Sequence, residues 1–529
     1  MQIVNNVALQ FPISNTYVPE ILSNIQRAEK IRTRSLLNES DLLVCWDYAE
    51  TQRLAYLFDQ RKPDDSLLDI PSPMLRDYTW PGFYTPFDHQ KTTASFLSLR
   101  KRAFCFNEAG TGKTSAAIWA ADYLMDMGIV KKVLIICPLS IMYTAWQADI
   151  FKTATHRTAA VAYGDRAKRT KVIQDIYDFT IINYDGVGII RKEIAAQKFD
   201  LIIVDEANAY KNSSTKRWRA LAEIITADTF VWMMTGTPAA QSPEDAFGLA
   251  RVIAPHRIPK FKTQWRDRVM QQISRFTWIP RHNAQKNVHF ALQPAIRFTK
   301  DECLDLPSVV YQTREIPLTP QVAMYYKRLR QQMLIEAAGQ QISAVNAAAS
   351  LSKLLQISGG AVYTDEHDVV EFDISPRLQA LKEVLEETLH KVVVFVPFLH
   401  TIKVVTEFLR KEGYNTEIIN GDVSAKNRAV IIDKFQRETD PRVLVIQPQS
   451  ASHGVTLTAA DTVVFWSPVL SVETYLQCVA RIDRVTQKHS MLVVHLQGSD
   501  VERKTYKMLQ GKVDSHSRLV DLYQQVVEE

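Results

Sequence analysis

Residues 107–114 read NEAGTGKT and separate a short apolar run, Ala103–Phe106, from an amphipathic segment, Ser115–Met127. The glycines permit a tight turn in which successive backbone N–H groups face one point, and the start of a helix adds unpaired donors. The pattern predicts a strand, a phosphate-binding loop and a helix. The residues expected at bound ATP are Gly110, Thr111, Gly112, Lys113, Thr114 and Ser115, with Lys113 at the β- and γ-phosphates and Thr114 at Mg²⁺.

A second stretch, LIIVDEAN at 201–208, ends an apolar strand in two adjacent carboxylates. Parallel sheets bind their ligands at the edge where the strands end, so Asp205 and Glu206 are expected beside the phosphate-binding loop. Asp205 suits either a direct or an outer-shell contact with the Mg²⁺ at Thr114, and Glu206 suits a base that orients the attacking water. The two stretches together predict a site that hydrolyses ATP with Mg²⁺.

Short β-branched runs alternate with helical stretches from about residue 90 to 240 and again after about residue 390. Residues 240–390 do not show this alternation. This alternation predicts an α/β fold with two parallel sheets covered by helices. The expected strands of the first sheet are Val133–Cys137, Thr180–Asn183, Leu201–Val204 and Phe230–Met234. Those of the second sheet are Val392–Val396, Thr416–Ile419, Val443–Ile446, Thr462–Phe465 and Met491–His495.

The length of 529 residues predicts several domains. Residues 1–70 are expected to form a small α+β accessory domain, 71–245 a first ATPase domain, 246–375 a basic and helical insertion, and 376–529 a second α/β domain with a C-terminal helix. Within the insertion, residues 251–300 hold eleven Lys or Arg and one acid, Asp267, with Trp265 among the interleaved aromatic residues. That composition favours a nucleic-acid surface.

The net charge of +5 permits a polyanionic partner without requiring one. The five cysteines lack metal-ligand spacing, and scattered thiols are typical of a reducing compartment. Neither a signal peptide nor an apolar run long enough to span a membrane is present in the sequence. We therefore expect a monomeric, cytoplasmic and nucleoid-associated protein of a bacterial or phage type.

Several further motifs, in this order, make the chain resemble superfamily 2 helicases and, within them, the SWI/SNF branch of DNA translocases. They are PFDHQ (86–90), IICPLSIMYTAW (135–146), TIINYDGV (180–187), MTGTP (234–238), QSASHGVTLTAAD (449–461) and QCVARIDRVTQ (477–487). The resemblance implies two tandem RecA-like lobes, with Gln90 reading the adenine edge. It also implies that Arg481 and Arg484, on one helical face with Gln477, approach the γ-phosphate and stabilise the transition state.

Some residues depart from the family pattern. Asn208 stands where His is usual, Asp483 replaces a second His, and Thr486 replaces a Gly. Lys113 and Glu206 are retained, so the resemblance implies an active ATPase. The departures concern the steps that link hydrolysis to movement.

Motors of this family follow the nucleic-acid backbone, whose phosphates carry no sequence information. The residues expected to contact it are Ser140, Asn183, Tyr184, Ser450, Ser452, Thr456 and Trp265. Residues 1–60 are loosely similar to the HARP module of annealing helicases, which implies forked DNA as a substrate beside linear double-stranded DNA.

The leading hypothesis is therefore an ATP-dependent translocase on double-stranded DNA that remodels, re-anneals or clears it. A strand-separating RNA or DNA helicase is one alternative. An ATP-switched DNA clamp without steady hydrolysis is another. The LPS segment at 306–308, followed by a long helical stretch, favours the DNA translocase.

Overall fold

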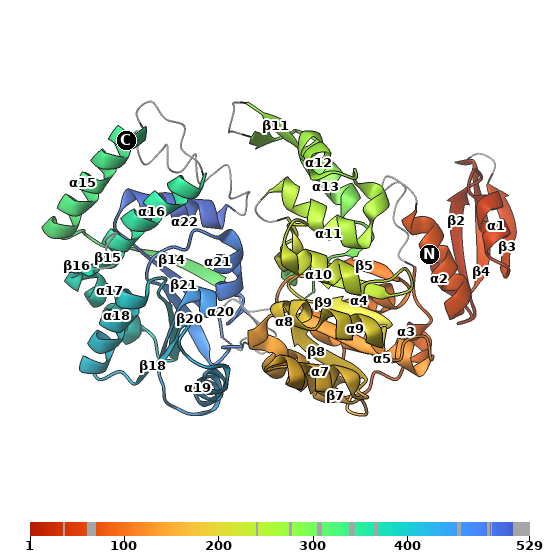
Figure 1. Cartoon of the computed structure of the whole chain (residues 1–529), viewed down its shortest axis with the longest axis horizontal. Helices are drawn as coiled ribbons and strands as arrows, with labels where there is room; N and C mark the ends of the chain where they lie inside the picture. The colour runs from red at the N-terminus through yellow and green to blue at the C-terminus, as the bar shows by residue number, and fades with distance from the viewer. Residues whose placement is uncertain are drawn as a thin grey trace. The chain divides into compact units, whose positions relative to one another are not determined.

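The computed structural model describes the chain except residues 35–36, 61–69, 240–241, 274–277, 304–308, 338–343, 364–368, 452–455, 484–486, 488 and 512–529. The chain divides into two compact units (Figure 1). The first contains residues 1–239, 244–269 and 282–303, and the second contains 240–243, 270–281 and 304–529. Each unit is described by itself.

The first unit begins with a small α+β domain. Its four-stranded antiparallel sheet has the order β1-β2-β4-β3, formed by Gln2–Val4, Ala8–Ser14, Glu39–Cys45 and Ala28–Arg34. Helices α1 (Val18–Asn24) and α2 (Tyr48–Asp59) bury apolar residues against β2 and β4. The sequence predicted a strand at Val7–Phe11, a helix at Val18–Arg27, a strand at Leu42–Trp46 and a helix at Glu50–Gln60, which correspond to β2, α1, β4 and α2. It missed β1 and β3, and β3 is largely exposed, so it lacks the apolar alternation that signals a strand.

Buried ion contacts join this domain to the rest of the first unit. Asp59, at the end of α2, accepts hydrogen bonds from Arg100 at 2.9 and 3.1 Å, and both side chains are buried. The guanidinium of Arg257 also reaches the backbone oxygen of Asp59. Residues 1–60 therefore pack on the first ATPase domain.

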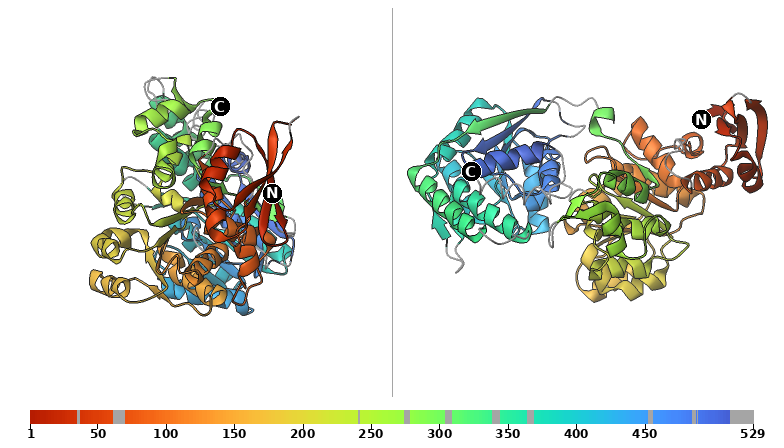
Figure 2. Two further views of the ribbon diagram at one scale, coloured as in Figure 1. Left: turned by 90° about the vertical axis from the view of Figure 1, so that its right-hand side faces the viewer. Right: turned by 90° about the horizontal axis from the view of Figure 1, so that it is seen from above.

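The main sheet of the first unit has seven parallel strands in the order β13-β5-β10-β9-β6-β8-β7. Helices flank it (Figure 2), and α5 is buried on nearly all sides between sheet and neighbours. The strands are β5 (Arg102–Cys105), β6 (Val133–Cys137), β7 (Ala159–Val161), β8 (Phe179–Asn183), β9 (Leu201–Val204), β10 (Phe230–Met234) and β13 (Ala295–Ile296). The helices are α3 (Met74–Asp77), α4 (Asp88–Ser98), α5 (Lys113–Asp126), α6 (Ala148–Thr153), α7 (Arg166–Gln174), α8 (Tyr184–Ile189), α9 (Arg191–Gln197), α10 (Lys216–Ile224), α11 (Ala246–Ile253), α12 (Lys262–Val269), α13 (Ala284–Ala291) and α14 (Lys300–Cys303).

The second unit contains a six-stranded parallel sheet in the order β14-β21-β20-β17-β19-β18. These strands are β14 (Val309–Glu315), β17 (Lys391–Phe395), β18 (Thr416–Ile419), β19 (Val443–Ile446), β20 (Ala460–Phe465) and β21 (Met491–Gln497). Two short hairpins pair β11 (Met270–Gln272) with β12 (Trp278–Pro280) and β15 (Ala361–Tyr363) with β16 (Val369–Glu371). The helices are α15 (Pro320–Ala337), α16 (Ala344–Gly359), α17 (Ser375–Glu387), α18 (Leu399–Lys411), α19 (Ala425–Arg437), α20 (Pro448–Ala451), α21 (Val472–Val479) and α22 (Asp500–Gln510).

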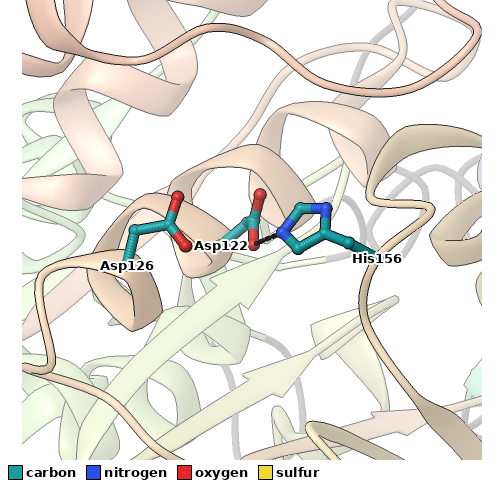
Figure 3. Close-up of side chains that lie close together, drawn as sticks. All are labelled: Asp122, Asp126 and His156. Atoms are coloured by element: carbon teal, nitrogen blue, oxygen red, sulfur yellow. Dashed lines mark hydrogen bonds and ion pairs between the residues drawn. The ribbon is translucent and has the colours of Figure 1, made fainter.

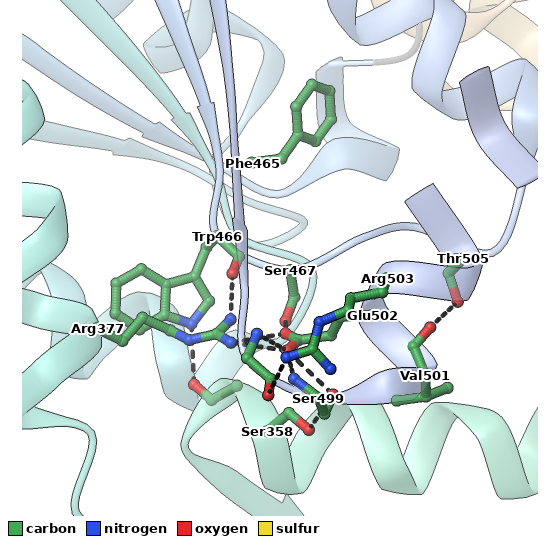
Figure 4. Close-up of polar contacts among 12 residues, drawn as sticks. Ser358, Arg377, Phe465, Trp466, Ser467, Ser499, Val501, Glu502, Arg503 and Thr505 are labelled. Carbon is green, nitrogen blue, oxygen red and sulfur yellow. Dashed lines mark hydrogen bonds and ion pairs between the residues drawn. The ribbon is translucent and has the colours of Figure 1, made fainter. Parts of the chain in front are cut away.

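A buried polar network holds α17 and α22 against the end of β20 (Figure 4). Arg377 forms a 2.8 Å ion pair with Glu502, and the two side chains are 3% and 0% exposed. Arg377 also donates to the backbone oxygen of Trp466 at 2.5 Å. Glu502 accepts from the backbone N–H groups of Gly498 and Ser499 at 2.8 and 3.0 Å. The charge of each buried group is thereby compensated.

The predicted fold class is confirmed, because both units are built on parallel sheets with many helices and the N-terminal sheet is small and antiparallel. Residues 246–375, expected as one insertion, are divided between the two units. The reason is strand pairing: β13 extends the first sheet beside β5, whereas β14 extends the second sheet beside β21. The domain limits themselves stay predictions. Among the described residues, no helix combines the length and apolar character needed to cross a membrane.

Candidate ATPase site

The predicted ATP motifs of the first unit meet at the edge of the sheet where its parallel strands end. The phosphate-binding loop follows β5, the MTGTP segment follows β10, and the Asp205–Glu206 pair follows β9. Because β10 lies between β5 and β9, all three segments leave neighbouring strands on the same side. The order of the strands thus brings together residues that are about a hundred positions apart in the chain.

The phosphate-binding loop has the backbone that the sequence predicted. Gly110 and Gly112 have φ values of 92° and 78°, in the left-handed region that glycine enters without strain. Gly112 is the N-cap of α5, so Lys113 and Thr114 occupy its first turn. The Lys113 side chain is buried, and its charge acts on Asp205. The Ser115 hydroxyl accepts a long hydrogen bond from Thr153 at 3.5 Å, so it faces α6.

Gln90 lies against this loop. Its side-chain oxygen accepts from the backbone N–H of Phe87 at 3.0 Å, and its Nε2 donates to the backbone oxygen of Thr111 at 3.3 Å. A Cβ added at Gly112 would come within 1.9 Å of Gln90 Nε2, so a larger residue at position 112 would displace the end of the Gln90 side chain. His89, which the sequence analysis did not single out, places Nε2 2.8 Å from the same Thr111 oxygen. Gln90 therefore contacts the phosphate-binding loop, and its contact with the adenine base stays a prediction.

The two carboxylates after β9 have different surroundings. Asp205 is buried, its Oδ2 accepts from the indole N–H of Trp146 at 2.9 Å, and its Oδ1 accepts from the backbone N–H of Glu206 at 2.9 Å. Burial, and next the charge of Glu206, raise the pKa of Asp205 above its ordinary value, whereas Lys113 and the Trp146 hydrogen bond oppose the rise. Glu206 is half-buried and has a φ of 47°. A non-glycine residue in this region is uncommon and is found at functional sites.

Asn208, the departure from the family's His, is bonded to the MTGTP segment. Its Nδ2 donates to the backbone oxygen of Thr237 at 2.9 Å and lies 3.3 Å from the Thr237 hydroxyl. The same segment approaches the phosphate-binding loop, because a Cβ at Gly236 would lie 3.3 Å from the backbone nitrogen of Ala109. The amide of Asn208 therefore bridges the two segments that follow β9 and β10.

Residues after β13 buttress the start of the loop. Asn107 is buried, donates to Thr93 at 2.8 Å and accepts from the backbone N–H of Phe298 at 3.1 Å. The backbone N–H of Lys300 donates to Glu108 at 3.2 Å. No local sequence signal marked the contact between Asn107 and Phe298, because it joins segments that are distant in the chain.

The donor set suits a nucleotide with a divalent cation. Asp205 offers a carboxylate and Thr114 a hydroxyl, which are oxygen ligands of the kind Mg²⁺ prefers. Lys113 adds a positive charge, and the first turn of a fourteen-residue helix adds backbone donors. These residues would hold a nucleotide's phosphates and their Mg²⁺, consistent with the sequence prediction.

A second carboxylate cluster lies on the other end of α5 (Figure 3). Asp122, Asp126 and His156 place possible ligand atoms close together. Arg157 forms ion pairs with both carboxylates, and the Tyr78 hydroxyl donates to Asp122 at 2.5 Å. A guanidinium inside the cluster opposes a cation there, so its role is to join α5 to residues 156–157.

In the second unit, the segment that contains Arg481 and Arg484 is only partly described. α21 ends at Val479, so Gln477 lies in the helix and Arg481 lies in the following turn. Arg481 is buried and its Nε donates to the backbone oxygen of Gln477 at 3.0 Å. The expectation that Arg481 and Arg484 share one helical face is therefore wrong for Arg481, because the helix has ended before it. Arg484 and Thr486 lie outside the described residues.

The predicted nucleic-acid residues are placed as follows. Ser140 is half-buried in the 3₁₀ turn Leu139–Ile141, and Asn183 accepts from Arg169 at 2.8 Å. The Tyr184 hydroxyl donates to the backbone oxygen of Asp205 at 2.7 Å, which ties it to the ATPase site. Ser450 lies in α20, and the Thr456 backbone oxygen accepts from Gln436. Ser452 lies outside the described residues.

Trp265 requires a correction. Its side chain is fully buried in α12, so in this structure the ring is not available to a nucleic acid. The basic stretch around it is also partly used internally, since Arg266 pairs with Glu244 at 2.9 Å and Arg257 is buried. The aromatic and basic composition of residues 251–300 thus serves packing as well as charge.

Comparison with known proteins gives two family matches. The model described as SNF2-related domain matches residues 89–360, and the helicase conserved C-terminal domain matches residues 376–486. The matched ranges contain the ATPase site of the first unit and the Arg481 segment of the second.

Individual relatives are distant. A mouse chromodomain-helicase-DNA-binding protein 1-like is 24% identical over 78% of this chain and 47% of its own length. An ATP-dependent helicase of Mycoplasma genitalium is 24% identical over 74% of this chain and 37% of its own length. A putative protein of Acyrthosiphon pisum secondary endosymbiont phage 1 is 25% identical over 76% of this chain and 90% of its own length. The chain thus spans less than half of the first two relatives.

Among solved structures, the SWI2/SNF2 ATPase core of Sulfolobus solfataricus in complex with double-stranded DNA is 21% identical. The match covers 84% of this chain and 94% of that chain, with a TM-score of 0.41.

Proposed function

Because this chain belongs to the SNF2-related family of helicase-like ATPases, we propose that it is an ATP-dependent translocase on double-stranded DNA, which remodels, re-anneals or clears that DNA. One observation carries the proposal. The phosphate-binding loop, the Asp205–Glu206 pair and the MTGTP segment meet at one sheet edge and are joined by Asn208 and by the close approach at Gly236.

The proposed chemistry assigns each group a task. Lys113 and the first turn of α5 bind the phosphates, and Thr114 with Asp205 would hold Mg²⁺, which would neutralise the charge that develops on the transferred phosphoryl group. Glu206 accepts a hydrogen bond from the attacking water and orients it. Arg481 and Arg484 are the candidates for stabilising the charge of the transition state, and Gln477 supports Arg481 by accepting its Nε–H at the backbone oxygen.

The proposed DNA contacts follow the backbone, so the activity should depend on strand form and not on sequence. Ser140, Asn183, Tyr184, Ser450, Ser452 and Thr456 are the candidate contacts. The bond between Tyr184 and the Asp205 backbone supports a link between DNA binding and hydrolysis.

The test is steady-state ATP turnover with no nucleic acid, linear duplex, forked duplex, single-stranded DNA or RNA. Duplex DNA should stimulate turnover most. Glu206→Gln should lower kcat by about 10²- to 10⁴-fold while nucleotide still binds, because it removes the group that orients water. Lys113→Ala should abolish turnover and weaken nucleotide binding. Glu193→Gln, on an exposed ion pair of the same unit, is the matched control and should leave turnover unchanged.

Translocation and strand separation need separate assays. Displacing a third strand from a triplex reports movement along duplex DNA, whereas releasing a strand from a partial duplex reports unwinding. The proposal expects the first activity without the second. Stimulation by RNA alone would contradict it, and tight ATP-dependent DNA binding without turnover would identify a clamp instead.

A further inference from the structure

Trp146 connects two segments of the ATPase site. Its side chain is 0% exposed, and its indole Nε1–H donates to Asp205 Oδ2 at 2.9 Å. The other carboxylate oxygen, Oδ1, accepts from the backbone N–H of Glu206 at 2.9 Å. Both oxygens of Asp205 are therefore oriented, one by the backbone beside it and one by a ring from another segment.

The backbone brings Trp146 to this place by an unusual route. After β6, the chain forms the 3₁₀ turn Leu139–Ile141 and then the π-helical segment Met142–Gln147, before α6 begins at Ala148. π-helical turns are rare and often mark functional sites, because the wider turn changes the direction of a side chain. Trp146 lies in this segment, one position before its end.

The chemistry of the contact suits a cation beside it. An indole N–H is a donor only, so it does not compete for a metal ion. A carboxylate oxygen has two lone-pair directions, so Oδ2 can accept from the indole and still face a cation. Partners of this kind set the orientation of metal ligands, and their loss typically weakens metal binding by about 10- to 100-fold.

We propose that Trp146 is a positioning residue whose indole N–H holds the Asp205 carboxylate in the orientation that binds nucleotide-associated Mg²⁺. This inference rests on the proposed function, in which Asp205 is the Mg²⁺ ligand. It adds a residue that touches neither nucleotide nor metal. It also makes the segment between β6 and α6 part of the metal site.

The variant Trp146→Phe removes the N–H and keeps an aromatic ring. Trp232→Phe is the matched control, because Trp232 is also 0% exposed, lies in β10 of the same sheet, and donates its indole N–H at 2.9 Å to a backbone oxygen, that of Arg100. Each variant loses one buried indole bond and the same side-chain volume. Only Trp146→Phe changes a contact with Asp205.

The measurement is the dissociation constant of ADP by calorimetry, with Mg²⁺ and with EDTA, on the full chain. In Trp146→Phe, the factor by which Mg²⁺ tightens ADP binding should fall by about 10- to 100-fold. Binding in EDTA should stay within about threefold, because the phosphate-binding loop is intact. Trp232→Phe should keep the wild-type factor. An unchanged factor in Trp146→Phe, or an equal fall in both variants, would overturn the proposal.

Two further arms keep the result decisive. Trp146→His restores a ring N–H in a smaller side chain, so its Mg²⁺ factor should lie above that of Trp146→Phe, and equality would count against the proposal. If Trp146→Phe does not fold, Trp146→Leu replaces it as the variant without a donor. The translocase proposal is tested separately, by DNA stimulation of ATP turnover in the wild-type protein. Mg²⁺-dependent ADP binding without stimulation by DNA would refute the translocase and leave the role of Trp146 intact.

Discussion

Replacing Glu502 with glutamine should destabilise the second unit much more than replacing the neighbouring Arg503. Glu502 and Arg377 form an ion pair in which neither side chain is more than 3% exposed. Glutamine has nearly the same shape, so the change removes a charge while creating little empty space. It leaves the Arg377 guanidinium buried without its counter-ion.

The magnitude follows from burial. Removing one partner of a buried ion pair costs about 3–5 kcal/mol, because the remaining charge is not compensated. The glutamine amide also presents N–H donors where Gly498, Ser499 and Ser467 donate to the carboxylate. We therefore expect the free energy of unfolding of the second unit to fall by about 3–5 kcal/mol.

Arg503→Gln is the comparison on the same helix. Arg503 pairs with Glu315 at 3.1 Å and Asp500 at 2.7 Å, but its side chain is 39% exposed. Exposed pairs of this kind contribute about 0.2–1 kcal/mol. The two variants change adjacent residues of α22 and differ mainly in burial.

The assay must report on the second unit alone, since a chain of two units need not unfold in one step. Hydrogen exchange of peptides covering β20 and β21, measured across a urea series, gives that local free energy. A difference below about 1 kcal/mol between Glu502→Gln and Arg503→Gln would refute the reasoning. The double variant Arg377→Met/Glu502→Leu should recover only part of the loss, because neither charge is then left buried but the N–H groups of Gly498 and Ser499 lose their acceptor.

Three further predictions concern single sites. Gly112→Ala should weaken ADP binding at least about tenfold by calorimetry, because the added Cβ would lie 1.9 Å from Gln90 Nε2. Gly128→Ala is the control, because Gly128 also has a positive φ, of 70°, but has open space around it; this variant should leave ADP binding unchanged. Asn208→Ala should lower DNA-stimulated kcat by about five- to tenfold and spare ADP binding, since it removes the bond to Thr237; equal losses in both would contradict this. Burial lowers the pKa of His495 to about 4, so the unfolded state binds its proton first. The free energy of unfolding should therefore fall by up to about 3 kcal/mol as pH drops from about 6.5 to about 4, and His495→Phe should flatten that profile in urea titrations.

Most strands of the two parallel sheets could be predicted from sequence because they are short apolar runs that are largely buried. β9, β10, β18 and β19 have the bounds expected from their apolar runs. The family assignment made from the motifs is confirmed, since the matched models cover residues 89–360 and 376–486. Such motifs are local in the chain, so they can be recognised without knowledge of tertiary contacts.

What sequence could not give depends on contacts between distant segments. β13 has only two residues and forms because β5 offers an edge to pair with. Trp265 carries no sign that distinguishes a buried indole from an exposed one, and the structure buries it. The sequence also carries no sign that α21 ends before Arg481, because the spacing of residues 477–484 continues to fit a helix. The likeness of residues 1–60 to the HARP module stays a prediction.

The place of β13 in the first sheet has a consequence for how the protein is made. β5 ends at Cys105 and its partner begins at Ala295, a separation of 295 − 105 = 190 residues. At about 5–20 residues per second, a ribosome needs roughly 10–40 s to synthesise that stretch. During this interval one side of β5, beside the phosphate-binding loop, has no strand to pair with. Nascent chains stalled before residue 295 should therefore be more sensitive to protease and more dependent on chaperones than chains stalled beyond residue 330.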